Sequence, residues 1–402
     1  MNGFGKLCSR NLLTYGRSKF VEETITLRQT QGSCHIKIPG GHKLRFTSTL
    51  VLATLCAIAA GSVSADISSA DTSITVVSPK SYQVFQRKSL YDGYIRVSGD
   101  VHTDFDKLKI RIPGKSIKGD LSGKWQAVPF AKQTHSFSSV VAVVSGGWYK
   151  VDFQAMKENK VVAQASVDKV GVGEVFVGAG QSNSTNCGQE KINQTSGMVS
   201  SFSGSCWQIA NDPQPGPHDN TQGGSFWPAF GDAMYEKYHV PIGVAVTGHG
   251  GTNVSQWQMD AAEGLFSWMM TRIYQLGYQG FRAVLWHQGE SDAETPTDTY
   301  VEKLSTVINK SNELAGWEFP WFIAYASYHS VEHPSWPLVR EAQHKLITTG
   351  IVLEGPDTDT LCGDNRDCGG AGIHFSPKGL KAHGKMWADK VSVYLDKVLA
   401  AK

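Results

Sequence analysis

The pattern of apolar and polar positions in the chain changes character near residue 172. Before that point the two kinds alternate, as Leu108, Ile110 and Ile112 do with the residues between them. A period of two is that of a strand with one buried face, and glycine- and proline-rich turn signals separate the alternating stretches. The pattern predicts a small all-β sandwich over residues 66–172, of immunoglobulin-like size. We expect it to serve in packing or as a spacer, with carbohydrate binding as the alternative.

From residue 173 to residue 402, short apolar runs alternate with helical patterns. We expect an irregular loop between about residues 184 and 224, which are rich in glycine, serine and asparagine. Strands separated by helices make a doubly wound parallel sheet of the flavodoxin-like kind. The five expected strands cover residues 174–177, 242–247, 283–286, 321–326 and 351–353. The expected helices cover residues 226–238, 265–276, 300–314, 338–348 and about 377–399, the last capped by Ser376.

Residues 1–65 have the features of a leader. A basic stretch at residues 42–45 precedes an apolar run over residues 46–60, and the small residues Val63-Ser64-Ala65 follow. This order predicts a signal peptide over about residues 43–65, with a transmembrane anchor as the alternative. Because signal peptides rarely begin so far into a chain, we expect the start to be over-extended. The mature protein is then expected to be secreted or periplasmic, with no membrane association after signal removal.

Composition narrows the classes of function. The chain is 41% hydrophobic and 18% charged, as in soluble globular proteins. Its net charge of +2 is uneven, because residues 66–402 carry 30 basic and 34 acidic side chains, a net charge of −4. No basic patch or phosphate-binding glycine loop is evident there, which argues against nucleic acid and against a nucleotide cofactor. We expect no cofactor, no metal and no obligate protein partner.

The cysteines beyond the leader suggest disulfide bonds. Four remain after residue 65, and an even number in an exported protein is typical of a disulfide framework. Of the three ways to pair them, we favour Cys187–Cys206 and Cys362–Cys368. A zinc site is the alternative, although the spacings do not fit one.

Chemistry-bearing residues follow the expected strands. Ser182 comes after the strand at residues 174–177 and the run Gly178-Ala-Gly180, which allows a tight turn that exposes a hydroxyl. Polar loops follow the other strands at residues 248–253, at residues 287–292, and after residue 355, the last leading to His374. Because parallel strands end at one edge of a sheet, these loops are expected to meet. They would supply a nucleophile, a base and oxyanion donors, which acyl transfer requires.

With these residues the chain resembles the SGNH-hydrolase superfamily, and most of all its sialate O-acetylesterase and carbohydrate esterase family 6 branch. The resemblance spans residues 173 to about 395. The blocks that carry it, in order, are Gly180–Asn183, Gly250–Thr252 with Trp257, Trp286–Glu290, and Ile373–Ser376 with Gly379 and Leu380. It implies a secreted esterase that removes acetyl groups from acetylated carbohydrates, and the leading sandwich is similar to the family's accessory domain.

By the same resemblance Ser182 is the nucleophile and His374 the general base. The oxyanion donors are the amide of Ser182, the amide of Gly251 or else Gly250, and the side chain of Gln288. We expect Gln288→Ala to keep the fold and lose activity by about 10²–10³. The candidate substrate-binding residues are Asn183, Asn253, Trp257, His287 and Glu290, although Glu290 also suits a structural hydrogen-bonding role beneath the site.

The chain departs from the family pattern at the catalytic acid. The family places an aspartate three residues before the histidine, and Ala371 stands there in this chain. Asp367 is one candidate, if a Cys362–Cys368 bridge folds the loop back on His374. A Ser–His dyad is another, and Asp364 or Glu290 are further options.

Two other functions and the identity of the sugar stay open on the sequence. The same fold could bind carbohydrate without catalysis, or hydrolyse aryl or lipid esters, although the polar loop at residues 184–224 does not suggest an apolar groove. Sialic acid would call for a cation to meet its carboxylate, whereas xylan and other neutral glycans need none. The arginines after Ser182 are Arg272, Arg282, Arg340 and Arg366.

Overall fold

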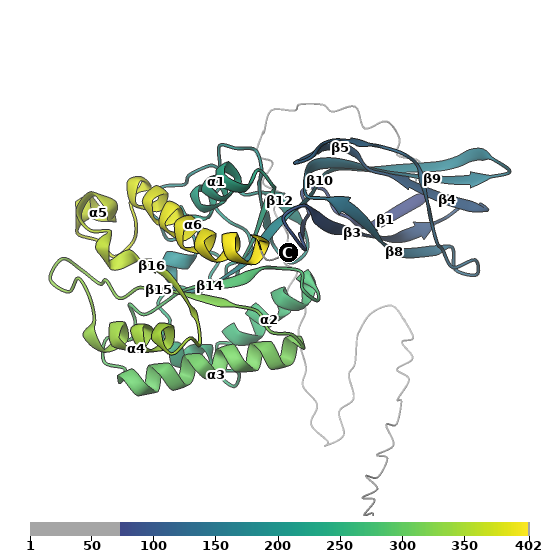
Figure 1. The fold of residues 1–402 in the computed structure, drawn as a ribbon. Helices are drawn as coiled ribbons and strands as arrows, with labels where there is room; N and C mark the ends of the chain where they lie inside the picture. The colour runs from purple at the N-terminus through teal and green to yellow at the C-terminus, as the bar shows by residue number, and fades with distance from the viewer. Residues whose placement is uncertain (1–72, 401–402) are drawn as a thin grey trace, which may run out of the picture. The chain divides into compact units, whose positions relative to one another are not determined.

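The computed structural model describes residues 73–400, which belong to one compact unit. The predicted leader over residues 1–65 lies outside the described residues. A β-rich region precedes an α/β domain (Figure 1), as the alternation patterns predict. Within the described residues, no helix is both long and apolar enough to cross a membrane.

The β-rich region pairs its strands in two sheets. Strands β1, β3 and β8 form an antiparallel sheet, and its side chains alternate between buried and exposed along β3, as a period of two requires. Buried residues such as Ile95 and Phe153 form the core between the sheets. The strands are β1 (Ile74–Ser78), β2 (Val84–Gln86), β3 (Asp92–Val101), β4 (Lys107–Arg111), β5 (Pro113–Ser116), β6 (Gly119–Ser122), β7 (Gln126–Val128), β8 (Ser136–Val144), β9 (Gly146–Lys157) and β10 (Lys160–Gly180).

Strand β10 is 21 residues long and belongs to both regions. Its first part pairs antiparallel with β9 in the β-rich region. From Glu174 onward it pairs parallel with β13, and from Phe176 onward also with β14. The change of pattern near residue 172 therefore marks a change of neighbours within one continuous strand.

The sheet of the α/β domain has the order β12-β11-β13-β10-β14-β15-β16. Its strands are parallel except for β12, which is antiparallel to β11. The five expected strands correspond to the end of β10 and to β13, β14, β15 and β16. The other strands are β11 (Val199–Phe202), β12 (Trp207–Ile209), β13 (Ile242–Val246), β14 (Ala283–His287), β15 (Trp321–Tyr325) and β16 (Leu353–Asp357).

Two details of the predicted sheet were wrong. Strands β11 and β12 come from the segment expected to be an irregular loop, because Ser200 and Ser201 are polar yet buried in a strand paired with β13. Strand β16 begins two residues later than expected. The pair Gly355-Pro356, which has the composition of a turn, lies inside it.

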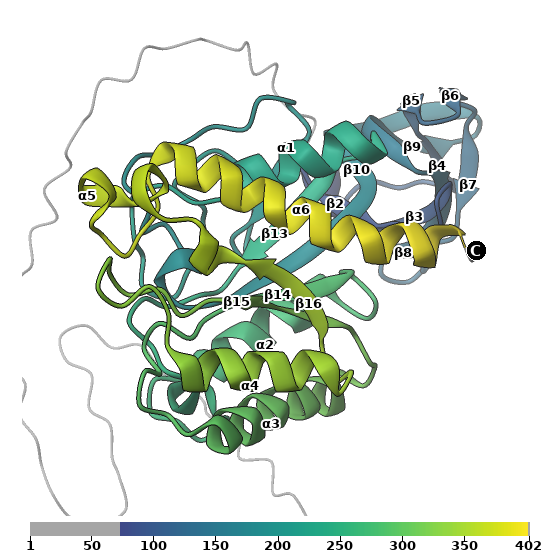
Figure 2. The same cartoon turned by 60° about the vertical axis from the view of Figure 1, so that its left-hand side comes forward.

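Helices cover both faces of this sheet (Figures 1 and 2). Helices α1 and α6 pack against each other on one face, and α2, α3 and α4 lie on the other. Ser376 caps α6 as expected, since its hydroxyl accepts the N–H of Gly379 at 3.2 Å. The helices are α1 (Trp227–Tyr238), α2 (Leu265–Leu276), α3 (Thr297–Ala315), α4 (Pro337–Thr348), α5 (Asp367–Gly370) and α6 (Pro377–Ala400), with short 3-10 turns η1 (Ser182–Ser184), η2 (Val254–Trp257), η3 (Thr358–Thr360) and η4 (Gly363–Asn365).

The predicted disulfides are absent, because Cys187, Cys206, Cys362 and Cys368 are all free thiols. Cys187 accepts a hydrogen bond from Thr185, whereas Cys206 lies exposed in the turn between β11 and β12. Cys362 and Cys368 are both exposed, and hydrogen bonds rather than a bridge fold their loop back. No three His, Cys, Asp or Glu side chains of the described residues gather in a group that could hold a metal.

A buried ion cluster joins the β-rich region to the α/β domain. The Glu174 carboxylate on β10 lies 2.7 Å from Arg87 Nε and 2.7 Å from Arg282 Nε, and its side chain is fully buried. Gln86 donates a further hydrogen bond at 2.9 Å. Burial alone would raise the pKa of Glu174, but the charges of Arg282 and Arg87 outweigh it and lower the pKa below its ordinary value of 4.5.

We expect Glu174→Gln to lower the free energy of unfolding by about 3–5 kcal/mol, because it leaves buried cations without a counter-charge. Since the native pKa of Glu174 is lowered, its contribution is complete above the unfolded-state pKa and is lost as the pH falls through the native value. Urea unfolding should therefore show the largest deficit of the variant near neutral pH and a smaller one in acid.

The matched control is Glu354→Gln, which removes a half-exposed carboxylate paired with Lys390. Its expected cost is under about 1 kcal/mol. Equal losses for the two variants would contradict a structural role for the buried cluster.

Candidate active site

Ser182 lies at the carboxyl end of β10, where the sequence places it. It begins η1 and is only 6% exposed. Gly180 precedes it with φ +126°, and a Cβ at that position would lie 2.1 Å from the carbonyl oxygen of His287. The turn that presents Ser182 therefore requires glycine at position 180, because any larger residue would be strained and would clash.

His374 and Asp367 lie beside each other at the same edge of the sheet. His374 Nδ1 is 3.7 Å from Asp367 Oδ2, and the Asp367 N–H donates to the His374 carbonyl at 3.0 Å. Asp364, by contrast, is exposed and pairs with Lys378. Burial lowers the pKa of His374 below 6.5, the negative charge of Asp367 raises it, and the charge of Arg366 lowers it.

Asn183 connects the segment of Ser182 to the segment of His374. Its Nδ2 donates to Glu290 Oε1 at 2.9 Å and to the carbonyl of Ile373 at 3.3 Å. The residue after Ser182 thus contacts the residue before His374. Among the described residues, the Ser182 hydroxyl makes no hydrogen bond to His374 itself.

Arg366 holds the loop that carries Asp367 and His374, a role that sequence reasoning missed. It is 2% exposed, and its guanidinium lies 3.9 Å and 4.2 Å from the ring centroids of Tyr328 and Phe375. Its guanidinium nitrogens donate to the carbonyls of Leu361, Ile373 and Thr358 at 2.6, 2.8 and 2.9 Å. These bonds fold the loop in the way that we expected a disulfide to do.

None of the four arginines after Ser182 is available to a substrate carboxylate in this structure. Arg366 is bound to its own loop, and Arg282 is paired with Glu174. Arg340 pairs with Asp357 and Asp359, and Arg272 is buried beside aromatic rings. Recognition of a carboxylate next to Ser182 would need other donors.

The two glycines of the second block differ in what their amides do. The Gly250 N–H donates to Asp219 Oδ2 at 2.6 Å, so this amide is already occupied. Gly251 is exposed with φ +70°, and a Cβ there would meet no atom within 4 Å. Its N–H has no acceptor among the described residues, which leaves Gly251 as the better candidate for an oxyanion donor.

The expected role of Gln288 as an oxyanion donor does not fit its surroundings. The side chain is fully buried, and its Nε2 lies 3.2 Å from Gln181 Oε1, 3.0 Å from the Thr252 carbonyl and 2.5 Å from Asp292 Oδ2. Its Oε1 accepts the hydroxyl of Tyr300 at 3.0 Å. Gln288 therefore binds together the loops under the site, and none of its donors is left for a substrate.

The side chains of four of the five candidate substrate-binding residues make hydrogen bonds within the protein. Trp257 is fully buried and donates to Thr252, and the side chain of Asn253 caps η2. His287 is buried and lies 3.0 Å from Thr358 Oγ1, and burial lowers its pKa to about 3. Glu290 accepts a hydrogen bond from Asn183, and burial raises the pKa of Glu290 to about 7.

A further cluster beside Ser182 did not emerge from the sequence. His218 Nδ1 and His249 Nδ1 are 2.7 Å apart, and the ring of Trp268 lies edge-on to His218 at 5.3 Å. Asp219, the neighbour of His218, holds Gly250. Of these residues only His249 lies in one of the polar loops that follow the expected strands. His218 and Asp219 lie in the segment expected to be an irregular loop, where no sequence motif pointed to them.

Comparison with known proteins identifies a family that this chain matches. A family model described as "Carbohydrate esterase, sialic acid-specific acetylesterase" matches residues 172–393. A carbohydrate acetylesterase from Xanthomonas citri has a similar structure, with a TM-score of 0.52 and 17% sequence identity over 77% of this chain and 72% of that one. The structure of a protein from Arabidopsis thaliana, also 17% identical in sequence, aligns with a TM-score of 0.44 over 55% of this chain and 98% of that one. At these identities the structural matches concern the fold alone, and no curated protein matches the chain.

The hydrogen bonds of Gln288 are expected to contribute to the stability of the fold. We expect Gln288→Ala to lower the free energy of unfolding by about 1–3 kcal/mol, because buried Asp292 and Gln181 each lose a partner. Urea unfolding measures the change. The control Gln222→Ala, at an exposed loop position, should cost less than about 0.5 kcal/mol. A Gln288 variant as stable as the wild type would disprove the bracing role.

Proposed function

The chain belongs to the carbohydrate esterase family of sialic acid-specific acetylesterases, and we propose that it removes acetyl esters from sugars with Ser182 as nucleophile. Membership of this family implies an ester hydrolase that acts on acetylated carbohydrate. The observation that carries the finer proposal is the Asp367–His374 pair, on a loop that Asn183 ties to the segment of Ser182.

The proposed reaction passes through an acyl-enzyme. Ser182 Oγ attacks the ester carbonyl carbon while its proton passes to His374, and the imidazolium returns that proton to the departing sugar hydroxyl. A water molecule, deprotonated by His374, then attacks the acyl carbon, the bond to Ser182 Oγ breaks, and the imidazolium returns its proton to Ser182 Oγ as acetate leaves. The amides of Ser182 and Gly251 stabilise the negative oxygen in both steps.

Asp367 is the catalytic acid in this proposal, in preference to Asp364, Glu290 or a dyad. Its carboxylate faces Nδ1 of His374, so it would fix the tautomer in which Nε2 is free to accept the serine proton. Glu290 instead accepts a hydrogen bond from Asn183. The expected signal peptide leads us to propose secretion or periplasmic export as well.

Ser182→Ala should lower the release of acetate by about a thousand-fold or more, because the nucleophile is removed. The measurement is acetate release from p-nitrophenyl acetate and from a panel of acetylated sialosides, acetylated xylan and acetylated algal polysaccharides. Ser138→Ala, an exposed serine on β8, is the control and should act as the wild type does. If Ser182→Ala retained turnover, catalysis through Ser182 would be ruled out. The rates of the wild-type protein on the panel identify the preferred sugar.

Asp367→Asn should lower kcat by on the order of 10²–10⁴, because the imidazolium loses its negative partner. The acid limb of the kcat/KM profile should also move to lower pH. His374 must be neutral to act as a base, and the charge of Asp367 raises its pKa, so removing that charge lowers the pKa further.

Asp364→Asn is the matched control, because Asp364 lies in the same loop but is exposed. It should change neither kcat nor the pH profile. If the two variants behaved alike, or if Asp367→Asn left the acid limb in place, Asp367 would lose the role of catalytic acid.

A further inference from the structure

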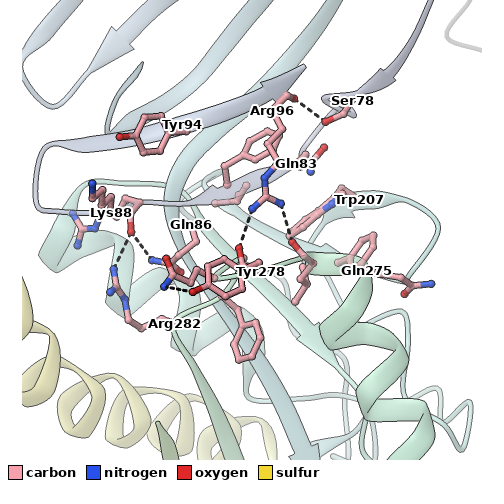
Figure 3. A pocket seen from close by; sticks show the side chains of 18 of the residues that line it. Ser78, Gln83, Gln86, Lys88, Tyr94, Arg96, Trp207, Gln275, Tyr278 and Arg282 are labelled. Carbon is pink, nitrogen blue, oxygen red and sulfur yellow. Dashed lines mark hydrogen bonds between the residues drawn. The ribbon is translucent and has the colours of Figure 1, made fainter. Parts of the chain in front are cut away.

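A groove of about 720 Å³ lies between the β-rich region and the α/β domain (Figure 3). Strands β1 and β3 contribute one wall, and the segment after α2, with Gly204 and Trp207, contributes the other. The volume is within the usual range for small-ligand sites, about 300–1,000 Å³. None of the residues assigned to the active site lines it.

The groove and Ser182 lie at opposite edges of the parallel sheet. Arg282, which lines the groove, immediately precedes β14 and pairs with Glu174, where the parallel part of β10 begins. Ser182 follows the other end of β10. Gly180 is six residue steps along the strand from Glu174, a rise of roughly 20 Å. The groove is therefore a second location and not an extension of the active site.

Hydrogen bonds across the groove keep its walls in place. Arg96 on β3 donates to the carbonyls of Leu276 and Tyr278 at 3.4 and 3.0 Å (Figure 3). Lys80 Nζ donates to the carbonyl of Ser205 at 2.5 Å. The Glu174 cluster adjoins these bonds, so the groove is preformed. A ligand would therefore lose little binding free energy to ordering of the groove walls.

Aromatic rings from both walls are exposed in the groove. Tyr94 on β3 is 43% exposed and Tyr278, after α2, is 62% exposed, and Trp317 also lines the groove. Tyrosine and tryptophan are amphipathic, with an apolar ring and a polar end. Such rings suit the apolar faces of sugar rings, and the side-chain amides of Gln83, Gln275 and Gln279 nearby suit sugar hydroxyls.

The charge of the groove is positive. Its lining includes the cationic side chains of Arg87, Arg96, Arg282, Lys80 and Lys88 and one acidic side chain, that of Glu318. Counting also the buried Glu174 that pairs with two of the arginines, the net charge is +3. Residues 66–402 as a whole carry a net charge of −4. The groove is therefore positively charged on a protein whose net charge is negative.

We propose that this groove is a second glycan-binding site that takes a carboxylate-bearing stretch of polysaccharide. The choice of a sugar as ligand rests on the proposed function, whereas the choice of an anionic one rests on the charge of the groove. By holding one part of a polymer here, the protein raises the local concentration of acetylated residues around Ser182.

The test is binding to the full chain carrying Ser182→Ala, so that no turnover disturbs the measurement. Isothermal titration calorimetry would use α2,8-linked polysialic acid and polygalacturonate as two sources of sugar carboxylates, and deacetylated xylan as a neutral probe. We expect at least one anionic probe to bind, with an affinity that falls as salt rises, and xylan to bind about tenfold or more weakly. Equal binding of neutral and anionic probes, or no binding of either anionic probe, would overturn the proposal.

Tyr278→Ala should weaken anionic binding by about tenfold, and so should Lys80→Gln through the lost charge. The matched control is Tyr274→Ala, since Tyr274 is also exposed on this stretch, at 54%, but lies outside the groove lining. Unchanged binding in Tyr278→Ala and Lys80→Gln, with thermal unfolding confirming the fold, would also overturn it.

The same groove variants made with Ser182 intact should hydrolyse p-nitrophenyl acetate at the wild-type rate. This separates the two proposals. If the groove variants bind normally while the intact protein releases acetate, the groove proposal fails alone. If no ester is hydrolysed but the anionic probes bind through Tyr278, the esterase proposal fails alone.

Discussion

The fold depends on keeping the carboxylate of Glu174 charged in a place without water. Two guanidinium groups make that possible, Arg87 from the β-rich region and Arg282 from the segment before β14. Such a cluster contributes little net stability over an apolar one, but removing one member leaves a buried charge uncompensated. We infer that it acts mainly as a constraint on how the α/β sheet and the β-rich region join, because another arrangement would leave a buried charge without its partner. Strand β10 passes through this point and ends at Gly180, so the constraint also sets where Ser182, the proposed nucleophile, lies.

The candidate active site shows the same principle on a smaller scale, with buried polar side chains bracing loops. Gln288 joins the segments of Gln181, Thr252 and Asp292, and Arg366 gathers three carbonyls of the His374 loop. Each is nearly or fully inaccessible to solvent, where an unsatisfied polar group is costly, so each loop has one strongly preferred position. In the proposed function only Ser182, Gly251 and His374 would contact the substrate. Most of the other polar residues in the motifs hold the loops that carry these three.

This distinction explains what the sequence could and could not predict. Strand ends and turn glycines are read directly from residue types, so the α/β domain and the positions of Ser182 and His374 at one sheet edge could be expected. The direction in which a side chain points is not encoded in its type. Gln288, Trp257 and His287 occur in motif blocks, yet all three face inward. Strand β11 was missed because Ser200 and Ser201 have low strand propensity and are paired only by virtue of the neighbouring β13. The loop of Cys362 and Cys368 shows the same limit, since the buried side chain of Arg366, and not a disulfide, holds it.

The electrostatics around His374 show why both Arg366 and Asp367 matter to the proposed chemistry. Burial and the Arg366 charge favour the neutral imidazole, which is the form able to accept a proton, while Asp367 favours the imidazolium formed after transfer. Burial raises the pKa of Glu290 to about 7, so this carboxyl is only partly ionised near neutral pH, and it hydrogen-bonds to Asn183 rather than to His374. Asp367 is thus the carboxylate that acts most directly on His374, and the loop geometry that Arg366 imposes determines how strongly it acts. A base that is neutral in the resting state and stabilised when charged needs both influences, and two consecutive residues, Arg366 and Asp367, supply them.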